Sequence, residues 1–429
     1  MTVLGIVLFF LGILFSIFWH ELGHFTTARW FGIKVPEFMV GFGKTVWSRR
    51  SGETEFGFKA IPLGGYIRMI GMLPPEKGGT LGRSRRTGPF QGMIDDARRQ
   101  SAMDVLPEDA DRQFWTRKPW QRIVVMFAGP FMNLILAVIL FAIVLMGIGV
   151  PTTGTTVGSV SACVVPATAQ TDTCPPNPQK TPAALAGLQA GDRIVSFNGR
   201  TLSPTDGDAL RGAIQAASGT VTVVVDRGGQ RVTLTPTLIP NQVQDANDPS
   251  KLVQASFLGV GLASAGYVQQ SPSAVFSAIG DIVARTGGAI VALPSRVPGL
   301  FGSVFLGEQR DINGPVGIVG ASRIGGEILA RDQPVAATLS LFVQLLAAVN
   351  ISLFLFNLLP IPPLDGGQIF PALWEALKKR GARLLGRPDP GPVDVAKLLP
   401  VAYVVALVFI AWSGLLFVAD IINPIRLSQ

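Results

Sequence analysis

Long apolar runs separated by polar segments are the main pattern along this chain. Each of four runs approaches the roughly 20 residues that a helix needs to cross the hydrocarbon layer of a membrane. The first run has no basic region before it and no small-residue cleavage site after it, so we expect a membrane helix rather than a cleaved signal peptide. The pattern therefore predicts transmembrane helices at residues 1–25, 121–150, 337–367 and 398–420.

The segments between these helices differ in pattern. Residues 26–72 are rich in glycine and alternate polar with apolar positions, which indicates short strands or a hairpin associated with the membrane. Residues 73–113 are rich in Pro, Gly, Arg and Asp and lack apolar periodicity, so we expect a flexible cytoplasmic insert. Residues 270–336 have helical apolar spacing and are expected to form an amphipathic linker on the outer membrane surface. Residues 368–397 are expected to form a cytoplasmic loop.

Residues 155–265 have the pattern of a small globular domain, for which about 110 residues are enough. Residues 156–160 and 221–225 are β-branched strand candidates. A short helix is expected at 181–188, and after it a turn, a strand and a turn at Asn198-Gly199.

Composition and charge add an orientation. Of 429 residues, 48% are hydrophobic and only 15% are charged, which is typical of a multi-span membrane protein. Residues 26–122 hold 17 Lys and Arg against 10 Asp and Glu, and residues 366–397 hold 6 against 3, whereas residues 150–335 hold 12 of each. Because basic loops remain on the cytoplasmic side, we expect the 155–265 domain and both termini outside the cytoplasm. This topology accounts for the net charge of +8, and since no nucleic-acid-binding motif accompanies that charge we expect no nucleic-acid partner.

The two cysteines, Cys163 and Cys174, both lie in the segment expected outside the cytoplasm. Disulfides persist in that compartment. We therefore predict a bridge between them, with two free thiols as the alternative.

The candidate chemistry begins at His20-Glu21-Leu22-Gly23-His24, which contains the only two histidines of the chain and ends the first apolar run. Histidines four residues apart lie on one face of a helix, about 6 Å apart along its axis. Both imidazoles can then hold one zinc ion, while Glu21 reaches a water molecule as general base. Strongly polar residues are costly at membrane depth, which favours a functional site over two satisfied histidines at a helix end.

A catalytic zinc ion needs a third protein ligand and one open position. The candidate ligand is Asp365, where three prolines end the third helix and two glycines allow tight backbone geometry. Irregular backbone at membrane depth is tolerated only beside protein or a polar cavity. A helix-capping aspartate at the membrane surface is the alternative.

The string at residues 183–199, with AALAGL, GD and NG, resembles the signature of a PDZ domain. PDZ domains add a peptide as an extra strand and hold its C-terminal carboxylate beside a glycine-containing loop. Leu258, Gly259 and Val260 resemble that loop, placed at the end of the domain as in permuted bacterial PDZ domains. A PDZ domain that only limits access is the alternative.

Together the motifs resemble the site-2 protease family of intramembrane zinc metalloproteases, and closely its bacterial regulator-of-sigma-E protease type. The resemblance covers the whole chain through HELGH, GFG, PLGGY, AGP-x-x-N at 128–133, GPVGI and N-x-x-P-x-P-x-L-D-G-G. It implies Zn²⁺ as cofactor, His20, His24 and Asp365 as its ligands, and Glu21 as the catalytic residue. It also implies substrate contacts from the 41–43 loop, the 55–60 strand and the third helix end; the candidate residues are Gly41, Phe42, Gly43, Phe56, Phe58, Asn357 and Pro362.

The resemblance further implies a protease of the bacterial inner membrane that cuts single-span proteins inside the bilayer. Its substrates would be anti-sigma factors already clipped outside the membrane, with remnant signal peptides as a second class. A helical substrate hides its peptide bonds, and adding the unwound segment to a sheet edge re-satisfies its backbone groups. The expected fold is four transmembrane helices with a membrane-associated β-hairpin or sheet, plus one extracytoplasmic α+β PDZ domain.

Two other functions compete with this prediction. A HExxH protease of the prenyl-protein type would take its third ligand from Glu or His on a later helix, which Asp365-Gly366-Gly367 fits poorly. A membrane-anchored PDZ adaptor with a structural metal is a non-enzymatic alternative, and it predicts that Glu21→Gln leaves function intact.

Overall fold

Two compact units make up the chain. The computed structural model describes residues 1–75, 90–103, 105–164, 174, 178–244, 252–311 and 314–425. The membrane unit combines Met1–Val144 with Ser271–Gln429, and the insert unit is Leu145–Gln270.

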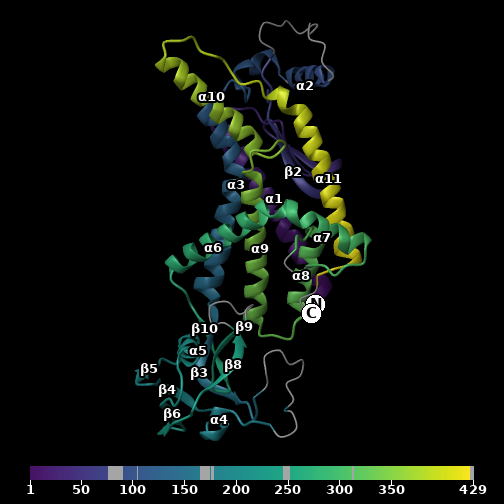
Figure 1. Ribbon diagram of the computed structural model, residues 1–429. Coiled ribbons are helices and arrows are strands. Elements are labelled where there is room, and N and C mark those ends of the chain that lie inside the picture. Colours follow the sequence, from purple (N-terminus) through teal and green to yellow (C-terminus); the bar gives the residue numbers. More distant parts are fainter. Residues whose placement is uncertain are drawn as a thin grey trace. The chain divides into compact units, whose positions relative to one another are not determined.

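Long apolar helices dominate the membrane unit (Figure 1). Within the described residues, five helices are long and apolar enough to cross a membrane. They are α1 (Thr2–Trp30), α3 (Pro119–Ala142, continued by η2, Ile143–Ile148), α6 (Pro272–Val291), α9 (Val335–Asn357) and α11 (Leu399–Ile422). Four of them coincide with the predicted transmembrane helices. The chain is a multi-pass membrane protein.

Helix α6 is the additional candidate, and it lies in the segment expected on the outer membrane surface. Figure 1 shows α6 running across α3 and α9 instead of alongside them. A position of α6 on the membrane surface stays a prediction.

Helix α1 lies at the centre of the membrane unit and packs against α3, α8 (Ile318–Ala330) and α9. Small residues allow α8 to approach closely, because a Cβ on Gly5 would lie 2.8 Å from the Cα of Gly326. On another side of α1, the Asn350 amide donates a hydrogen bond of 2.9 Å to the Ser16 hydroxyl. Small residues and interhelical hydrogen bonds are the usual means of packing helices in lipid, so α1 is held firmly along its length.

The remaining helices of the membrane unit are shorter; they are α2 (Gln91–Met103), η1 (Pro107–Arg112), α7 (Leu293–Phe305), α10 (Gly366–Leu384) and η3 (Val395–Leu398). The prediction of a flexible insert at 73–113 is wrong for α2 and η1. Arg98 of α2 donates to Asp394 at 2.6 Å, so an ion pair to a segment distant in sequence holds this polar helix, which also buries Ile94. Residues 76–89 lie outside the described residues.

A strongly bent pair of strands, β1 (Glu37–Ser51) and β2 (Thr54–Arg68), forms the predicted β segment. Each strand folds back so that residues 37–40 pair with both 55–58 and 65–68, and residues 47–51 pair with 54–58. The result is four short strand segments side by side, in the order 47–51, 54–58, 37–40 and 65–68. The rings of Phe25 on α1 and Phe38 pack edge to face at 5.5 Å and join this sheet to the helix.

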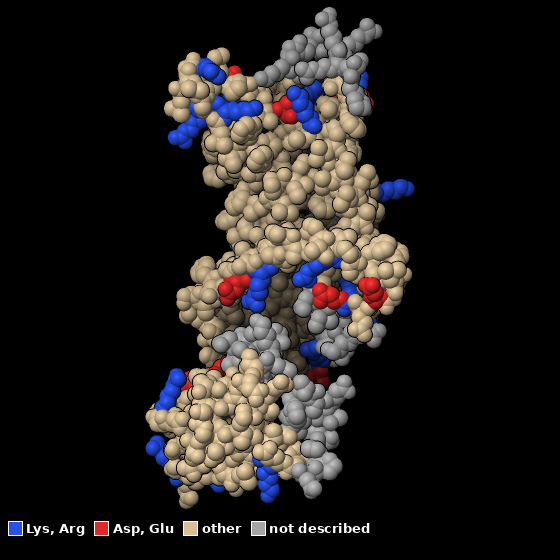
Figure 2. All heavy atoms as spheres, in the orientation of Figure 1, with Lys and Arg blue, Asp and Glu red and all other residues tan. Residues whose placement is uncertain are grey.

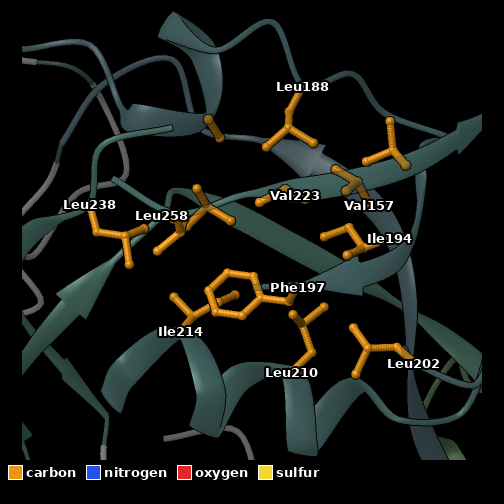
Figure 3. Packing of buried hydrophobic residues seen from close by; sticks show 13 residues of the cluster. Val157, Leu188, Ile194, Phe197, Leu202, Leu210, Ile214, Val223, Leu238 and Leu258 are labelled. Carbon is orange, nitrogen blue, oxygen red and sulfur yellow. The ribbon is translucent and has the colours of Figure 1, made fainter. Parts of the chain in front are cut away.

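The insert unit is an α+β fold. Its elements are β3 (Val150–Val160), α4 (Pro182–Leu185), β4 (Arg193–Phe197), β5 (Arg200–Thr201), α5 (Gly207–Ala216), β6 (Val223–Arg227), β7 (Gln230–Leu234), β8 (Ile239–Gln244), β9 (Leu252–Phe257) and β10 (Val260–Val268). The main sheet has the order β10-β3-β4-β6-β7, with β5 beside β4, and β8 pairs with β9 separately. Figure 3 shows Leu210 and Ile214 of α5 packed under Ile194 and Phe197 of β4. The i, i+4 pair on α5 thus packs against two buried residues of β4, which lie three positions apart on either side of an irregularity in the strand, and together they form part of the core.

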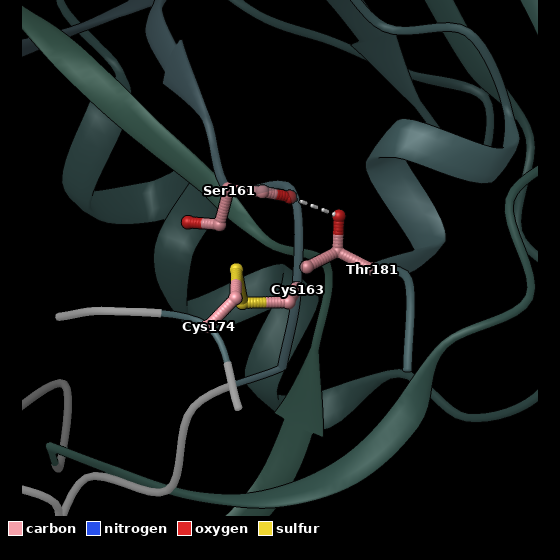
Figure 4. Close-up of a disulfide and its surroundings, with 4 residues drawn as sticks. All are labelled: Ser161, Cys163, Cys174 and Thr181. Atoms are coloured by element: carbon pink, nitrogen blue, oxygen red, sulfur yellow. Dashed lines mark hydrogen bonds between the residues drawn. A yellow bond between two sulfur atoms is a disulfide. The ribbon is translucent and has the colours of Figure 1, made fainter. Parts of the chain in front are cut away.

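Cys163 and Cys174 form a disulfide across 11 residues of sequence (Figure 4). Beside it, the Thr181 hydroxyl donates a hydrogen bond of 2.6 Å to the Ser161 carbonyl. Both contacts hold the chain around the end of β3.

Candidate metal centre

The two histidines lie on one face of α1, as expected from their spacing of four residues. Both are buried, with 9% of His20 and 5% of His24 exposed. Their ring centroids are 4.8 Å apart, and their Nε2 atoms are 3.1 Å apart. Two ring nitrogens therefore converge on one point inside the membrane unit.

Asp365 meets the histidines from the other end of the chain. It follows α9 and a proline-rich turn, and it is the residue before α10. Its Oδ2 lies 3.2 Å from His20 Nε2, and its Oδ1 lies 3.4 Å from His24 Nε2. The two glycines after Asp365 make this turn possible, because a Cβ on Gly366 would lie 2.2 Å from the Leu359 carbonyl oxygen. The sequence-predicted ligands thus come together from α1 and the α9–α10 turn.

The spacing of these three groups fits a tetrahedral zinc ion. The two Nε2 atoms are 3.1 Å apart and each lies 3.2–3.4 Å from a different oxygen of Asp365. One ligand atom from each residue can be chosen so that all three lie within 4.8 Å of one another, which is close enough to hold one metal ion. Among the described residues this is also the only His, Cys, Asp or Glu group whose spacing could hold a metal ion. One carboxylate and two imidazoles make up a donor set that suits zinc.

Helix α3 supplies the surroundings of the histidines, and no role was predicted for its AGP-x-x-N motif. The Val125 carbonyl lies 2.7 Å from His24 Nδ1, which leaves Nε2 of that ring free to bind a metal. The Asn133 side-chain amide nitrogen lies 3.2 Å from His20 Nδ1. Gly129 leaves room for the ring, since a Cβ there would lie 2.2 Å from His24 Nε2. The buried polar Asn133 and the Gly129-Pro130 pair in an apolar helix were the sequence signals for this role.

Glu21 is 9% exposed and lies against the second half of β2. A Cβ on Gly65 would come within 3.1 Å of Glu21 Cγ, and the Ile67 backbone lies near the Glu21 carboxylate. Residues 65–67 therefore lie directly beside the carboxylate that follows the first histidine.

The predicted substrate-binding residues differ in exposure and do not form one surface. Phe58 is exposed, but Phe56 packs against Phe25 and Phe38 in the core beneath α1. The 55–58 part of the predicted 55–60 strand has a strand partner on each side, which leaves no free strand edge there for an added peptide. In the bent sheet it occupies an inner position, and among the described strands 65–68 and 47–51 are the outer ones.

Gly41, Phe42 and Gly43 belong to β1, and the Phe42 ring stacks on Tyr66 with centroids 6.2 Å apart. Asn357 donates to the Leu353 carbonyl at 3.0 Å within α9. A Cβ on Gly367 would lie 2.6 Å from the Pro362 nitrogen, which places Pro362 against the start of α10 and next to Asp365.

The predicted peptide loop of the insert unit connects β9 to β10. Gly259 has a φ of +91° and a Cβ there would lie 2.4 Å from the Thr181 Cβ, so this position requires glycine. The Leu258 carbonyl accepts from the Ala183 N–H at 2.9 Å, and Val260 starts the outermost strand of the sheet order.

Comparison with known proteins agrees with the metal site. The model of peptidase family M50 matches residues 8–384. The chain is 35% identical to zinc metalloprotease Rip1 of Mycobacterium tuberculosis over 100% of both chains. It is 32% identical to zinc metalloprotease Rip1 of Mycolicibacterium smegmatis over 99% of both, and 31% identical to metalloprotease MmpA of Caulobacter vibrioides over 88% of this chain and 87% of that protein.

Proposed function

The chain belongs to peptidase family M50, the site-2 protease family, and is a zinc metalloprotease; from this premise we propose that it cuts single-span membrane proteins within the bilayer. The observation that carries the proposal is the convergence of His20, His24 and Asp365 on one point inside a unit of membrane-spanning helices. Anti-sigma factors already clipped outside the membrane are the substrate class that we propose first, with remnant signal peptides second.

In this proposal His20, His24 and Asp365 hold Zn²⁺, and Glu21 is the catalytic base. When bound, the ion supplies a Lewis acid that polarises the scissile carbonyl and makes water more acidic. Glu21 takes a proton from the attacking water and returns it to the leaving amine. Burial of His20, Glu21 and His24 limits the access of bulk water to the site, which strengthens the electrostatic contacts there.

The substrate must be unwound before water can attack its peptide bond. We propose that its extended segment pairs with residues 65–68 of β2, because this outer segment lies beside Glu21. Pairing there re-satisfies the freed N–H and C=O groups of the substrate. Phe42, stacked on Tyr66 of the same segment, would contact the substrate side chains.

Disulfide trapping distinguishes the two outer segments of the sheet. In a Glu21→Gln background, Tyr66→Cys should cross-link to a substrate with one cysteine near its cleavage site. Ser48→Cys on the opposite outer segment is the matched control. Cross-links at Ser48→Cys alone would overturn the proposed pairing.

Co-expression with a tagged single-span substrate tests the protease itself. Glu21→Gln should abolish cleavage while zinc stays bound, and Asp365→Asn should lower both. Cleavage by both variants at the parental rate would contradict the assignment. Intact biological function in Glu21→Gln would instead favour the adaptor with a structural metal.

We also propose a location in the bacterial inner membrane, with the insert unit and both termini outside the cytoplasm. The charge bias of the loops and the Cys163–Cys174 disulfide support this orientation. A membrane-impermeant thiol reagent added to whole cells should label Arg211→Cys in α5 and leave Arg383→Cys in α10 unlabelled. The reverse pattern would invert the topology.

The role of the insert unit is a separate proposal. We infer a PDZ domain in which β10 and the loop Leu258-Gly259-Val260 accept a peptide C-terminus, because β10 is outermost in the sheet order. A titration of the whole protein with C-terminal peptides of cleaved substrates tests it, with C-terminally amidated peptides as controls. Equal binding of both peptide forms would favour a domain that only limits access.

A further inference from the structure

Helix α10 has two opposite faces with contrasting surroundings. One face packs against α3 and buries Pro371, Ala372 and Glu375. The opposite face carries an apolar stripe at helical spacing whose members are 47–79% exposed; the α10 stripe consists of Phe370, Leu373, Trp374, Leu377 and Leu384. A helix in water does not keep such a stripe on the side away from its packing partner.

Basic side chains border the α10 stripe. Lys378 and Arg380 flank it on its two sides, and Arg383 and Arg387 follow toward the end of the helix. Figure 2 shows Lys and Arg gathered over this end of the membrane unit. An apolar stripe with basic flanks is typical of a helix at a membrane surface.

The nearby carboxylates do not neutralise these bases. Glu375 pairs with Arg122 at 2.6 Å and with Lys379 at 3.0 Å, and Asp394 pairs with Arg98 at 2.6 Å. The exposed Asp389, which follows Pro388, lies 3.8 Å from Lys379. In the part of the chain that the structure describes, Arg380, Arg383 and Arg387 form no ion pair with a carboxylate. The outer face of α10 therefore carries unpaired positive charge.

A hollow lies where α10 ends. It has a volume of roughly 430 Å³, and Lys378, Leu385, Arg387 and Pro388 are among the residues that line it. Two cations beside an exposed leucine suit a group that joins a phosphate to an acyl chain.

We propose that the outer face of α10 docks on the leaflet that lies on the same side of the membrane as α10, and that Lys378 and Arg387 hold the phosphate of an anionic phospholipid in this hollow. The α10 stripe contacts acyl chains, and Lys378 bridges toward the headgroup from above the Trp374 ring, 5.4 Å from its centroid. The positive charge selects an anionic lipid over a zwitterionic one. The proposal rests on the membrane location proposed above, but it does not depend on proteolysis.

The first test measures what surrounds the α10 stripe. A nitroxide on Leu377→Cys, in the inactive Glu21→Gln chain in phosphatidylcholine–phosphatidylglycerol vesicles, should be accessible to oxygen and shielded from a water-soluble nickel chelate. Val404→Cys on the exposed side of α11 gives the lipid reference, and Arg211→Cys on α5 the water reference. Nickel accessibility at Leu377→Cys and at Leu373→Cys equal to that at Arg211→Cys would overturn the docking.

The second test measures headgroup selectivity. Short-chain phosphatidylglycerol titrated onto the detergent-solubilised Glu21→Gln chain should bind at least about tenfold more weakly after Lys378→Gln with Arg387→Gln. Arg200→Gln with Arg211→Gln removes the same charge from the insert unit and should leave the affinity unchanged. Equal affinities of the two double variants, or equal affinities of the parent for phosphatidylcholine and phosphatidylglycerol, would overturn the phosphate site.

Discussion

The Nδ1 atom of His20 lies 3.2 Å from the side-chain amide nitrogen of Asn133. The Asn133 amide oxygen is buried and, among the described residues, has no hydrogen-bond partner. When Nε2 of a histidine binds a metal, Nδ1 carries the proton and needs an acceptor. Half a turn of the amide presents its oxygen to that proton, so Asn133 acts as a positioning residue for the His20 ring.

Replacing Asn133 should therefore change zinc binding through His20. Asn133→Leu removes the acceptor and should weaken zinc affinity by about 10–100-fold, whereas Asn133→Asp keeps an acceptor and should bind zinc nearly as the parent does. Competition with a chromophoric chelator measures both affinities. Asn350→Leu, a buried asparagine that contacts Ser16 instead of a histidine, is the control. Parental zinc affinity in Asn133→Leu would contradict the positioning role.

Gly129 should tolerate no side chain while the site is intact. A Cβ there would lie 2.2 Å from His24 Nε2, and a buried ring has no free direction in which to move. We expect Gly129→Ala to lower zinc occupancy, measured as metal per purified chain, and cleavage with it. Gly147→Ala is the matched control, because a Cβ at Gly147 meets nothing within 4 Å. Full zinc occupancy in Gly129→Ala would show that α3 does not enclose the site.

Most of the membrane-spanning helices and the pairing of His20 with His24 were predictable because apolar run length and i, i+4 spacing are local properties of the sequence. Asp365 lies at the other end of the chain, and it was assigned through the need for a third ligand and the family resemblance. The role of α3 was not predictable in the same way. Val125 acts through its backbone carbonyl, which every residue type offers, and Gly129 acts through the absence of a side chain. The buried polar Asn133 and the Gly129-Pro130 pair were unusual residue types for an apolar helix, but neither indicated what the helix contacts.

The β segment shows a different limit. Alternation predicted strands at 26–72, and β1 and β2 are there. Alternation of polar and apolar residues does not reveal that each strand bends back. The inner position of residues 55–58, which have a strand partner on each side, could therefore not be predicted. The polar helix α2 was missed for a related reason, because its anchor Asp394 lies 296 residues further along the chain from Arg98.

Asp192 should make the insert unit sensitive to acid. Hydrogen bonds from Arg227, at 2.7 Å to each carboxylate oxygen, and from the Gln189 N–H lower the pKa of Asp192. A lowered pKa stabilises the fold above the unfolded value of about 3.9, and this contribution is lost as pH falls toward the folded pKa.

The Asp192→Asn variant should lose roughly 2 kcal/mol of stability at pH 7 and less at pH 3. The measurement is hydrogen exchange of the β4 amides in the whole chain, corrected for intrinsic exchange rates. It gives the stability difference between Asp192→Asn and the parent at each pH. Asp208→Asn on the exposed surface of α5 is the control and should change little. A pH-independent difference between Asp192→Asn and the parent would show that the carboxylate charge contributes nothing.

The buried ion pair between Arg122 of α3 and Glu375 of α10 should be the most sensitive contact between these two helices. Only 7% of the Arg122 side chain and 1% of the Glu375 side chain are exposed, and their charged atoms are 2.6 Å apart. Removing one partner leaves the other charge buried without compensation, which costs about 3–5 kcal/mol. We therefore expect Glu375→Leu to lower the free energy of unfolding in SDS titrations by that amount.

The double variant Arg122→Leu with Glu375→Leu distinguishes the cost of leaving Arg122 unpaired from the loss of the other contacts of Glu375. It should be more stable than Glu375→Leu alone, because no charge remains buried, although Lys379 and the Val393 N–H still lose their Glu375 acceptor. Asp96→Asn in the exposed Arg99–Asp96 pair is the control and should cost less than about 1 kcal/mol. If Glu375→Leu cost no more than this control, water would have to reach Arg122, and α10 would not be packed on α3 as firmly as the buried pair requires.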